Sequence, residues 1–307
     1  MASITRFGTV LLDGAATVVM GEQAWWWRAV DILGDDAPTS LVGILDDWDH
    51  WSSVADAAPD PGPHLALEAE SLVWLPPVMP RKLICIGANY GKHNAEMLGD
   101  EAQPRPYSFL VPPTTTLVGS MADVPLPTHA KKIDYEVELA VVIGRRAKAV
   151  SADDALSVVF GYSILNDISA RDWVPADSFM GMDWVIMKSF DRSAPMGPWI
   201  TAASEVSNPQ ALDLSLTVND DSRQQSNTAD MVFSVAKLIE HLSSVMTLEP
   251  GDVIATGTPE GTAFGNDDLY LRAGDIMRAE ITGLGVLVNQ VSVGNHLPVP
   301  ALTGPGT

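Results

Sequence analysis

Cysteine is nearly absent from this sequence. Cys85 is the single cysteine among 307 residues, so an internal disulfide is excluded and a thiolate metal cluster cannot form. Its neighbours Leu83, Ile84 and Ile86 predict a buried strand, in which we expect the thiol to pack as an inert apolar group. A single cysteine is consistent with a reducing compartment, and residues 1–6 lack the apolar run of a signal peptide. We therefore expect a cytoplasmic protein.

Basic residues are also scarce. Lys and Arg number 18 against 39 Asp and Glu, which gives a formal net charge of −21. Nucleic acid and anionic membranes are recognised by clustered Lys and Arg, so neither is expected as a partner. No apolar run approaches the roughly 20 residues that a membrane span needs. An anionic substrate would require a metal ion or a local group of basic side chains, which directs attention to clustered carboxylates.

Several catalytic signatures are missing as well. The sequence has no Gly-x-Ser-x-Gly nucleophile elbow, no Walker loop, no Rossmann glycine pattern and no His-Glu-x-x-His zinc helix. The chain is nevertheless long enough, and at 46% hydrophobic residues apolar enough, to bury a substantial core. Any function must therefore be sought in less familiar groupings of polar residues.

The spacing of apolar residues predicts a β-rich chain in two parts. Residues 1–78 are expected to form a small N-terminal α+β domain, with strands over 9–12, 17–20 and 25–30 and a helix over 41–57. Residues 79–307 are expected to form the larger domain. Its strands are predicted over 83–86, 135–143, 161–166, 213–218, 253–256, 275–281 and 285–291, and its helices begin at Ser151 and Ser234. The fold class is therefore mixed α+β, and the tail over 298–307 is expected to be poorly ordered.

Two carboxylates share one face of a predicted strand. Glu136 and Glu138 lie two residues apart, and alternate residues of a strand point to the same side. The apolar run over 139–143 predicts that this strand enters the core. Carboxylates about 7 Å apart repel each other unless solvent or a cation screens them. The pair therefore indicates either a site for a hard cation (Mg²⁺, Mn²⁺ or Ca²⁺) or a solvated amphipathic strand.

Two further polar segments follow predicted apolar strands. Asp167 comes directly after the strand over 161–166, where an acidic residue fits either a ligand or a turn. His93 and Glu96 lie three residues apart, after the strand that contains Cys85. On a helix they would share one face, so the carboxylate could orient the imidazole and raise its basicity. An exposed His–Glu pair is the simpler alternative.

Six short motifs, taken together, resemble the fumarylacetoacetate hydrolase family from about Arg81 to Val291. They occupy residues 86–96, 134–144, 166–172, 188–191, 225–231 and 249–259, in the order and spacing of that family. The resemblance implies a mixed β-sandwich roll with a smaller N-terminal domain, assembled as a homodimer.

The resemblance also implies roles for individual residues. The ligands of Mg²⁺ or Mn²⁺ would be Glu136, Glu138 and Asp167. The substrate site would be formed by Lys188, Gly257 and Thr258, with Tyr90 and Arg171 nearby. His93, oriented by Glu96, would activate a water molecule. The expected partner is a small 2-oxo or enol acid.

Two departures from the family pattern bear on the substrate. Relatives commonly have Lys where this chain has Val111, and Gln where it has Val174. Fewer polar groups make the pocket less suited to a compact diacid such as oxaloacetate, so we expect a substrate with a bulky or aromatic tail. The apolar residues that would receive this tail, or alternatively pack in the core, are Phe179, Met180, Met182, Trp184 and Met187.

The predicted reaction is metal-dependent hydrolysis of a carbon–carbon bond in an acylpyruvate-like 2,4-dioxo acid, with Lys188 stabilising the enolate. Isomerases and decarboxylases of 2-oxo or enol acids use related chemistry, so the family leaves those activities open. A third alternative, of another class, is a non-catalytic β protein that holds a structural metal ion. That protein would have no use for Lys188 or for the pair formed by His93 and Glu96.

Overall fold

The fold is known from a computed structural model, which describes residues 4–22, 24–59, 61–98, 104–128, 130–173, 182–266 and 269–294, with the backbone alone for 96–98. Its strands are β1 (Arg6–Leu12), β2 (Ala15–Gly21), β3 (Trp25–Arg28), β4 (Leu67–Glu68), β5 (Val73–Trp74), β6 (Leu83–Gly87), β7 (Tyr107–Val111), β8 (Leu117–Val118), β9 (Asp123–Leu126), β10 (Ile133–Asp134), β11 (Val137–Ile143), β12 (Val159–Asn166), β13 (Ser169–Ala170), β14 (Ala194–Ala202), β15 (Asp213–Val218), β16 (Asp221–Asn227), β17 (Val253–Ala255), β18 (Ile276–Ile281) and β19 (Gly285–Val293). Its α-helices are α1 (Ala29–Leu33), α2 (Leu41–Asp46), α3 (Trp48–Ala57), α4 (Gly91–Leu98), α5 (Pro113–Thr116), α6 (Trp184–Lys188) and α7 (Val235–Val245).

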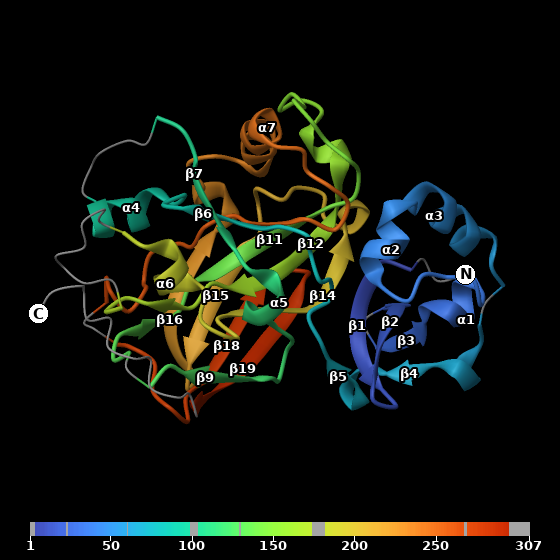
Figure 1. Ribbon diagram of the computed structural model, residues 1–307, viewed down its shortest axis with the longest axis horizontal. Helices are drawn as coiled ribbons and strands as arrows, with labels where there is room; N and C mark the ends of the chain where they lie inside the picture. The colour runs from blue at the N-terminus through green and yellow to red at the C-terminus, as the bar shows by residue number, and fades with distance from the viewer. Residues whose placement is uncertain are drawn as a thin grey trace, which may run out of the picture.

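One large sheet runs through the molecule. Its main path has the order β4-β3-β2-β1-β14-β12-β11-β17-β6-β7. The N-terminal strands join this sheet through β1, where Phe7 pairs with Ile200 of β14 (Figure 1). The domain boundary at residue 78 remains a prediction, but the hydrogen-bonded sheet continues across it.

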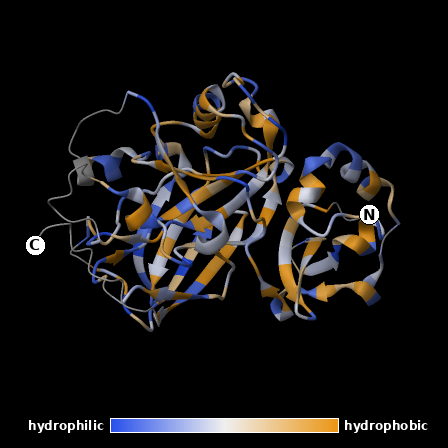
Figure 2. Ribbon diagram, in the orientation of Figure 1, coloured by the Kyte–Doolittle hydropathy of each residue, from blue (hydrophilic) through white to orange (hydrophobic). Residues whose placement is uncertain are grey.

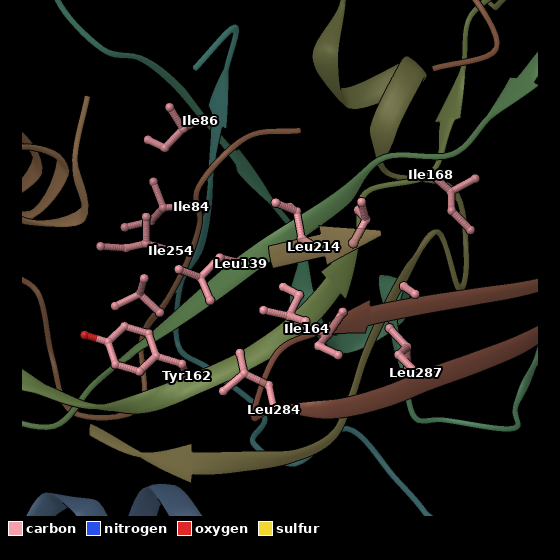
Figure 3. Packing of buried hydrophobic residues seen from close by; sticks show 14 of the residues in the cluster. Ile84, Ile86, Leu139, Tyr162, Ile164, Ile168, Leu214, Ile254, Leu284 and Leu287 are labelled. Atoms are coloured by element: carbon pink, nitrogen blue, oxygen red, sulfur yellow. The ribbon is translucent and has the colours of Figure 1, made fainter. Parts of the chain in front are cut away.

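A five-stranded sheet, in the order β16-β15-β18-β19-β9, packs on one face of the large sheet. The main core lies between them, and Figure 3 shows Leu139 and Ile164 of the large sheet beside Leu214 and Leu287 of the smaller one. The strand β11 alternates between two cores. Val137, Leu139, Val141 and Ile143 face the smaller sheet, whereas Ala140 and Val142 belong to a second cluster with residues of α1 and α2. The mixed α+β fold predicted from the sequence is confirmed.

Hydropathy follows this layered arrangement. The strands inside the molecule are mainly apolar, whereas α7 carries both colours in Figure 2. Its inward face consists of Val235, Leu238, Ile239 and Leu242, and its first turn is capped by the Ser234 hydroxyl, which accepts a hydrogen bond from the Lys237 backbone. Among the described residues, no helix is both long and apolar enough to cross a bilayer.

Three predicted elements differ in the structure. The helix predicted over 41–57 is two helices, because the backbone at Asp47 leaves the helical conformation (φ −136°, ψ 54°). Instead of an α-helix, the segment that begins at Ser151 forms a turn and a 3-10 helix over Ala155–Val158. Its capping interaction does form, since the Ser151 hydroxyl accepts the Asp154 backbone N–H, but the chain enters β12 at Val159 before an α-helix can develop.

The third difference concerns the acidic strand. The strand predicted over 135–143 is interrupted after Asp134, and β11 begins only at Val137. Several strands of the structure were not predicted, namely β4, β5, β7, β8, β9, β10, β13, β14 and β16. Among these, β14 contains Pro195, Gly197 and Pro198, and the sequence of β16 is polar throughout. The predicted disordered tail lies outside the described residues.

Candidate metal and substrate site

Three carboxylates meet where β11 begins and β12 ends. Glu136 precedes β11, Glu138 is its second residue, and Asp167 follows β12. One carboxylate oxygen from each lies within 4.8 Å of the others, and all three side chains are buried. The sequence left a solvated amphipathic strand open for the two glutamates, and their burial excludes it.

The interruption before β11 brings the acids together. In the antiparallel pairing of β11 with β12, Val137 lies opposite Asn166. The Asn166 side-chain oxygen accepts the Glu136 backbone N–H (2.9 Å), and the Asp167 backbone N–H donates to the Glu136 carbonyl (2.9 Å). These two bonds fix the main chain of Glu136 against the end of β12.

Glu138 is held by the segment that follows β17. The Gly257 backbone N–H donates to Glu138 Oε2 (2.8 Å). Gly257 has φ +93°, and a Cβ there would lie 2.8 Å from the Asn89 Cβ, so this position requires glycine. The family resemblance implied that Gly257 lines the substrate site; its backbone N–H instead binds Glu138, a predicted metal ligand.

Two buried cations face the same acids. Lys188 Nζ donates to Glu136 Oε2 (2.7 Å) and Asp167 Oδ2 (2.8 Å). The Arg171 guanidinium donates to the other Glu136 oxygen and, through Nε, to Asp134 Oδ2 (3.0 Å). The predicted site residues Lys188 and Arg171 are thus brought into the cluster, and Asp134 joins them without having been predicted.

The donor set fits a hard divalent cation. Four buried carboxylates, Asp134 included, face two cations, which leaves a formal charge of −2. Asp167 Oδ1 is buried and has no hydrogen-bond partner among the described residues. A buried carboxylate oxygen without a partner is costly, and oxygen-only ligands are those that Mg²⁺ and Mn²⁺ prefer. The residues that could hold such an ion are Glu136, Glu138 and Asp167.

The acids differ in their affinity for a proton. Burial raises the pKa of Glu138 well above its usual range, and the charges of Asp167 and Glu136 add to the shift. Burial also raises the pKa of Asp167 to about 6, although Lys188 opposes this. Burial would likewise raise the pKa of Glu136, but Lys188 and Arg171 outweigh it and hold that pKa at about 2. Negative charge is therefore held most firmly on Glu136, which contacts both Lys188 and Arg171.

His93 reaches the site from α4. The segment with His93 and Glu96 is helical, as their pairing on one face requires, and His93 is 6% exposed. Burial lowers the pKa of His93 to about 4, so the ring is neutral and able to accept a proton at neutral pH. Glu96 lies one turn further along the same helix, but its side chain is outside the described residues.

A cavity of about 500 Å³ adjoins the acids. One part of its lining is polar and comprises His93, Glu136, Asp167, Arg171, Lys188 and Thr258, together with Arg105. Another part is apolar and aromatic and comprises Ile86, Tyr107, Phe109, Met182 and Trp184. Trp184 stacks on Phe109 (4.5 Å between ring centroids, 14° between planes), and its indole N–H donates to the Tyr107 hydroxyl.

Some predicted residues lie away from the cavity lining. Tyr90 is fully buried in the main core, and its hydroxyl has no hydrogen-bond partner within the described structure. Val111 packs in the second hydrophobic cluster, so its apolar character does not directly shape the pocket. Met187 is also fully buried, while Val174, Phe179 and Met180 lie outside the described residues. Of the predicted apolar group, Met182 and Trp184 reach the cavity.

Comparisons with known proteins identify the family. The family model for the C-terminal part of fumarylacetoacetate (FAA) hydrolase matches residues 82–292. The chain belongs to the fumarylacetoacetate hydrolase family. The predicted resemblance is thereby confirmed, and the matched residues include every element that contributes to the acidic cluster.

Relatives in the fumarylacetoacetate hydrolase family carry different activities. An uncharacterized protein of Pyrococcus abyssi is 44% identical over 214 residues, which cover 70% of this chain and 91% of the relative. The mitochondrial oxaloacetate tautomerase FAHD2B of Homo sapiens is 35% identical over 261 residues, or 83% of this chain and 80% of that protein.

Solved structures of the family extend the match to nearly the whole chain. Maleylpyruvate hydrolase from Sphingobium sp. SYK-6, in complex with manganese(II) and pyruvate, has a TM-score of 0.76 and 32% identity, covering 94% of this chain and 99% of that one. The 2-hydroxyhepta-2,4-diene-1,7-dioate isomerase of Mycobacterium marinum has a TM-score of 0.72 and 28% identity, covering 95% and 100%. Hydrolases, isomerases and tautomerases thus share this fold, and the chain is an enzyme of this class.

Proposed function

We propose that this protein hydrolyses a carbon–carbon bond of an acylpyruvate-like 2,4-dioxo acid in the presence of Mg²⁺ or Mn²⁺. The observation that carries the proposal is a neutral, buried imidazole, His93, in the same cavity as the acidic cluster. A structural metal site would need no proton acceptor beside it. The 32% identity to a maleylpyruvate hydrolase that binds manganese and pyruvate supports the same conclusion.

The ion would be held by Glu136, Glu138 and Asp167, and when bound it would supply Lewis-acid stabilisation of negative charge on the 2-oxo acid end of the substrate. His93 takes a proton from water, and the resulting hydroxide adds to the distal carbonyl carbon. The bond to the neighbouring methylene carbon then breaks, and its electron pair becomes the enolate of pyruvate. His93 can return the proton to that carbon, which yields pyruvate and a carboxylic acid.

Lys188 and Arg171 would act as fixed positive charges in this reaction. Lys188 is 2% exposed and is held by two carboxylates. Burial lowers the pKa of Lys188, but the charges of Asp167 and Glu136 outweigh this effect, so that the pKa is raised overall. The ammonium therefore stays charged throughout the working pH range. A charge that is already oriented can stabilise the developing enolate without reorganisation.

The cavity supports a substrate with a large tail. Its volume of about 500 Å³ exceeds the needs of a four-carbon diacid, and the stacked pair formed by Trp184 and Phe109 presents an aromatic wall. Arg105, which also lines the cavity, offers a charge for a polar group on that tail.

A second candidate is keto–enol tautomerisation or isomerisation of a 2-oxo acid. It is favoured by the oxaloacetate tautomerases among the relatives, which reach 37% identity over 227 residues. Both reactions need a base and enolate stabilisation, and they differ in whether water attacks the carbonyl.

The proposed assembly is a homodimer, in keeping with the family.

The deciding experiment measures pyruvate release and enol absorbance together on a panel of acylpyruvates and oxaloacetate. Metal-stripped protein is assayed with and without Mn²⁺, beside His93→Ala. Mn²⁺-dependent pyruvate release from an acylpyruvate that is lost in the variant supports the hydrolase, whereas pyruvate from oxaloacetate alone would indicate decarboxylation. If the enol and keto forms interconvert but no substrate yields pyruvate, the hydrolase proposal is wrong and the tautomerase takes its place.

A further inference from the structure

A single glutamine from the smaller sheet reaches the strand that carries two of the acids. In β16, with the sequence DSRQQSN, only Gln224 is fully buried, at 1% exposure. The pairing of β15 with β16 shifts register beside it, because Leu216 lies opposite Gln224 and Thr217 opposite Ser222. At this bulge Arg223 has no paired residue on β15, and β16 is a polar edge strand.

The Gln224 side chain uses its whole amide. Its Oε1 accepts the Val137 backbone N–H (3.0 Å), and its Nε2 donates to Thr258 Oγ1 (2.8 Å) and the Pro259 carbonyl (3.0 Å). Thr258 Oγ1 in turn donates to the Val137 carbonyl (2.9 Å). Both main-chain groups of Val137 on this side are therefore bound by side chains.

The side chains of Gln224 and Thr258 make the hydrogen bonds to Val137 that the main chain of a neighbouring strand would make in a continuous sheet. On this edge β11 pairs with β17 only from Ala140 to Val142. Nearer the site, Thr256 still bonds the Leu139 carbonyl, but the chain then turns at Gly257. Without Gln224, the Val137 N–H would be a buried donor with no partner, which is costly and favours a shift of the strand.

Val137 lies between the two glutamates, so its orientation sets theirs. We propose that Gln224 is a positioning residue that fixes the spacing of Glu136 and Glu138 through the Val137 N–H, and holds Thr258 at the cavity wall. This inference rests on the proposed metal-dependent function, because it concerns affinity for the ion. Hydrogen-bonded groups behind metal ligands commonly account for about ten- to hundredfold in affinity.

The test compares Gln224→Met with Gln210→Met by titration of metal-free protein with Mn²⁺. Gln210 is a matched control, because its amide also joins two main-chain groups, the Thr228 carbonyl (2.8 Å) and the Val235 N–H (2.7 Å), away from the acids. We expect Gln224→Met to raise the Kd for Mn²⁺ about tenfold. Gln210→Met should lower the midpoint of thermal unfolding but leave the Kd within about twofold.

Turnover gives a second readout. If Gln224 acts through metal position, the Mn²⁺ concentration for half-maximal activity rises in the same ratio as the Kd, and excess Mn²⁺ restores kcat. An unchanged Kd in Gln224→Met overturns the inference even when the wild type binds Mn²⁺ and is active. A wild type that binds no Mn²⁺ overturns the proposed function as well. Should Gln224→Met fail to fold, Gln224→Asn, whose amide is one methylene shorter and cannot keep the bond to the Val137 N–H, is titrated instead and judged by the same criterion.

Discussion

At the scale of single residues, the site gathers charges that would not otherwise be buried together. Glu136 keeps its negative charge because Lys188 and Arg171 contact it, whereas Glu138 has a backbone N–H and no cation within hydrogen-bond distance among the described groups. A cluster that is incompletely neutralised costs stability in the metal-free protein. The same imbalance is a source of affinity for a divalent ion.

His93 gives a pH-dependent prediction. Its pKa falls from 6.5 to about 4 on folding, chiefly through burial. Below pH 6.5 the unfolded chain therefore binds a proton that the folded protein excludes, so the free energy of unfolding decreases as the pH falls and levels off below pH 4. We expect the wild type to lose about 2 kcal/mol more than His93→Gln between pH 7.5 and pH 5.

Urea denaturation at a series of pH values measures this difference. The control is His64→Gln, which alters a histidine at an exposed position. Parallel pH profiles for wild type and His93→Gln would show that His93 is not held neutral by the fold.

At the scale of elements, two short segments contribute much of the described cavity lining. The helix α6 contributes Trp184 and Lys188 from its two ends, so it supplies both the aromatic wall and the buried ammonium. The neighbouring strand β7 contributes Tyr107 and Phe109. In the proposed reaction, one helical turn would thus join recognition of the tail to stabilisation of the reacting end.

Replacing Trp184 should therefore change kcat/KM to different extents for substrates with different tails. We expect Trp184→Ala to lower kcat/KM about tenfold for an acylpyruvate with an aromatic tail, because about 1 kcal/mol of ring stacking is lost with the buried area. For a short aliphatic acylpyruvate the change should stay within about twofold. Steady-state kinetics on the two substrates provide the measurement.

The matched control is Trp25→Ala, which removes an indole that is 47% exposed on β3. It should affect neither substrate. An equal loss on both substrates in Trp184→Ala would mean that the tryptophan supports α6 rather than selecting the tail.

At the scale of the whole molecule, the N-terminal segment is tied to the site through the sheet. Phe7 of β1 and Met20 of β2 belong to the same buried cluster as Phe160 of β12 and Met196 of β14. Since β12 ends at the acids, the N-terminal strands support the strand that positions Asp167 (Figure 1).

Removal of residues 1–78 tests whether the predicted boundary separates independent domains. The fragment 79–307 would expose the paired edge of β14 and the apolar side chains that Phe7 and Met20 cover. We expect it to aggregate or to unfold well below the temperature of the full chain, as judged by size-exclusion chromatography and circular dichroism. A monodisperse, folded fragment that binds Mn²⁺ would establish an autonomous catalytic domain.

The sequence by itself determined the features that depend on near neighbours. The alternation around Glu136 and Glu138 and the strand end at Asp167 marked each acid as a possible ligand beside a plainer alternative. The resemblance to the family joined the three into one set, and the structure brings them together. The apolar periodicity located most strands, and the Ser234 cap located α7. These patterns are visible because strand and helix periods are written in residues a few positions apart.

Only the tertiary structure decided what surrounds those acids. The interruption before β11 depends on Asn166 and Gln224, which are distant in sequence and act through side-chain hydrogen bonds. Arg105 and Tyr107 enter the cavity because β7 pairs with β6. Val111 leaves it because its side chain packs in the second cluster. Such contacts depend on the path of the whole chain, because they join polar side chains and main-chain groups that are far apart in the sequence.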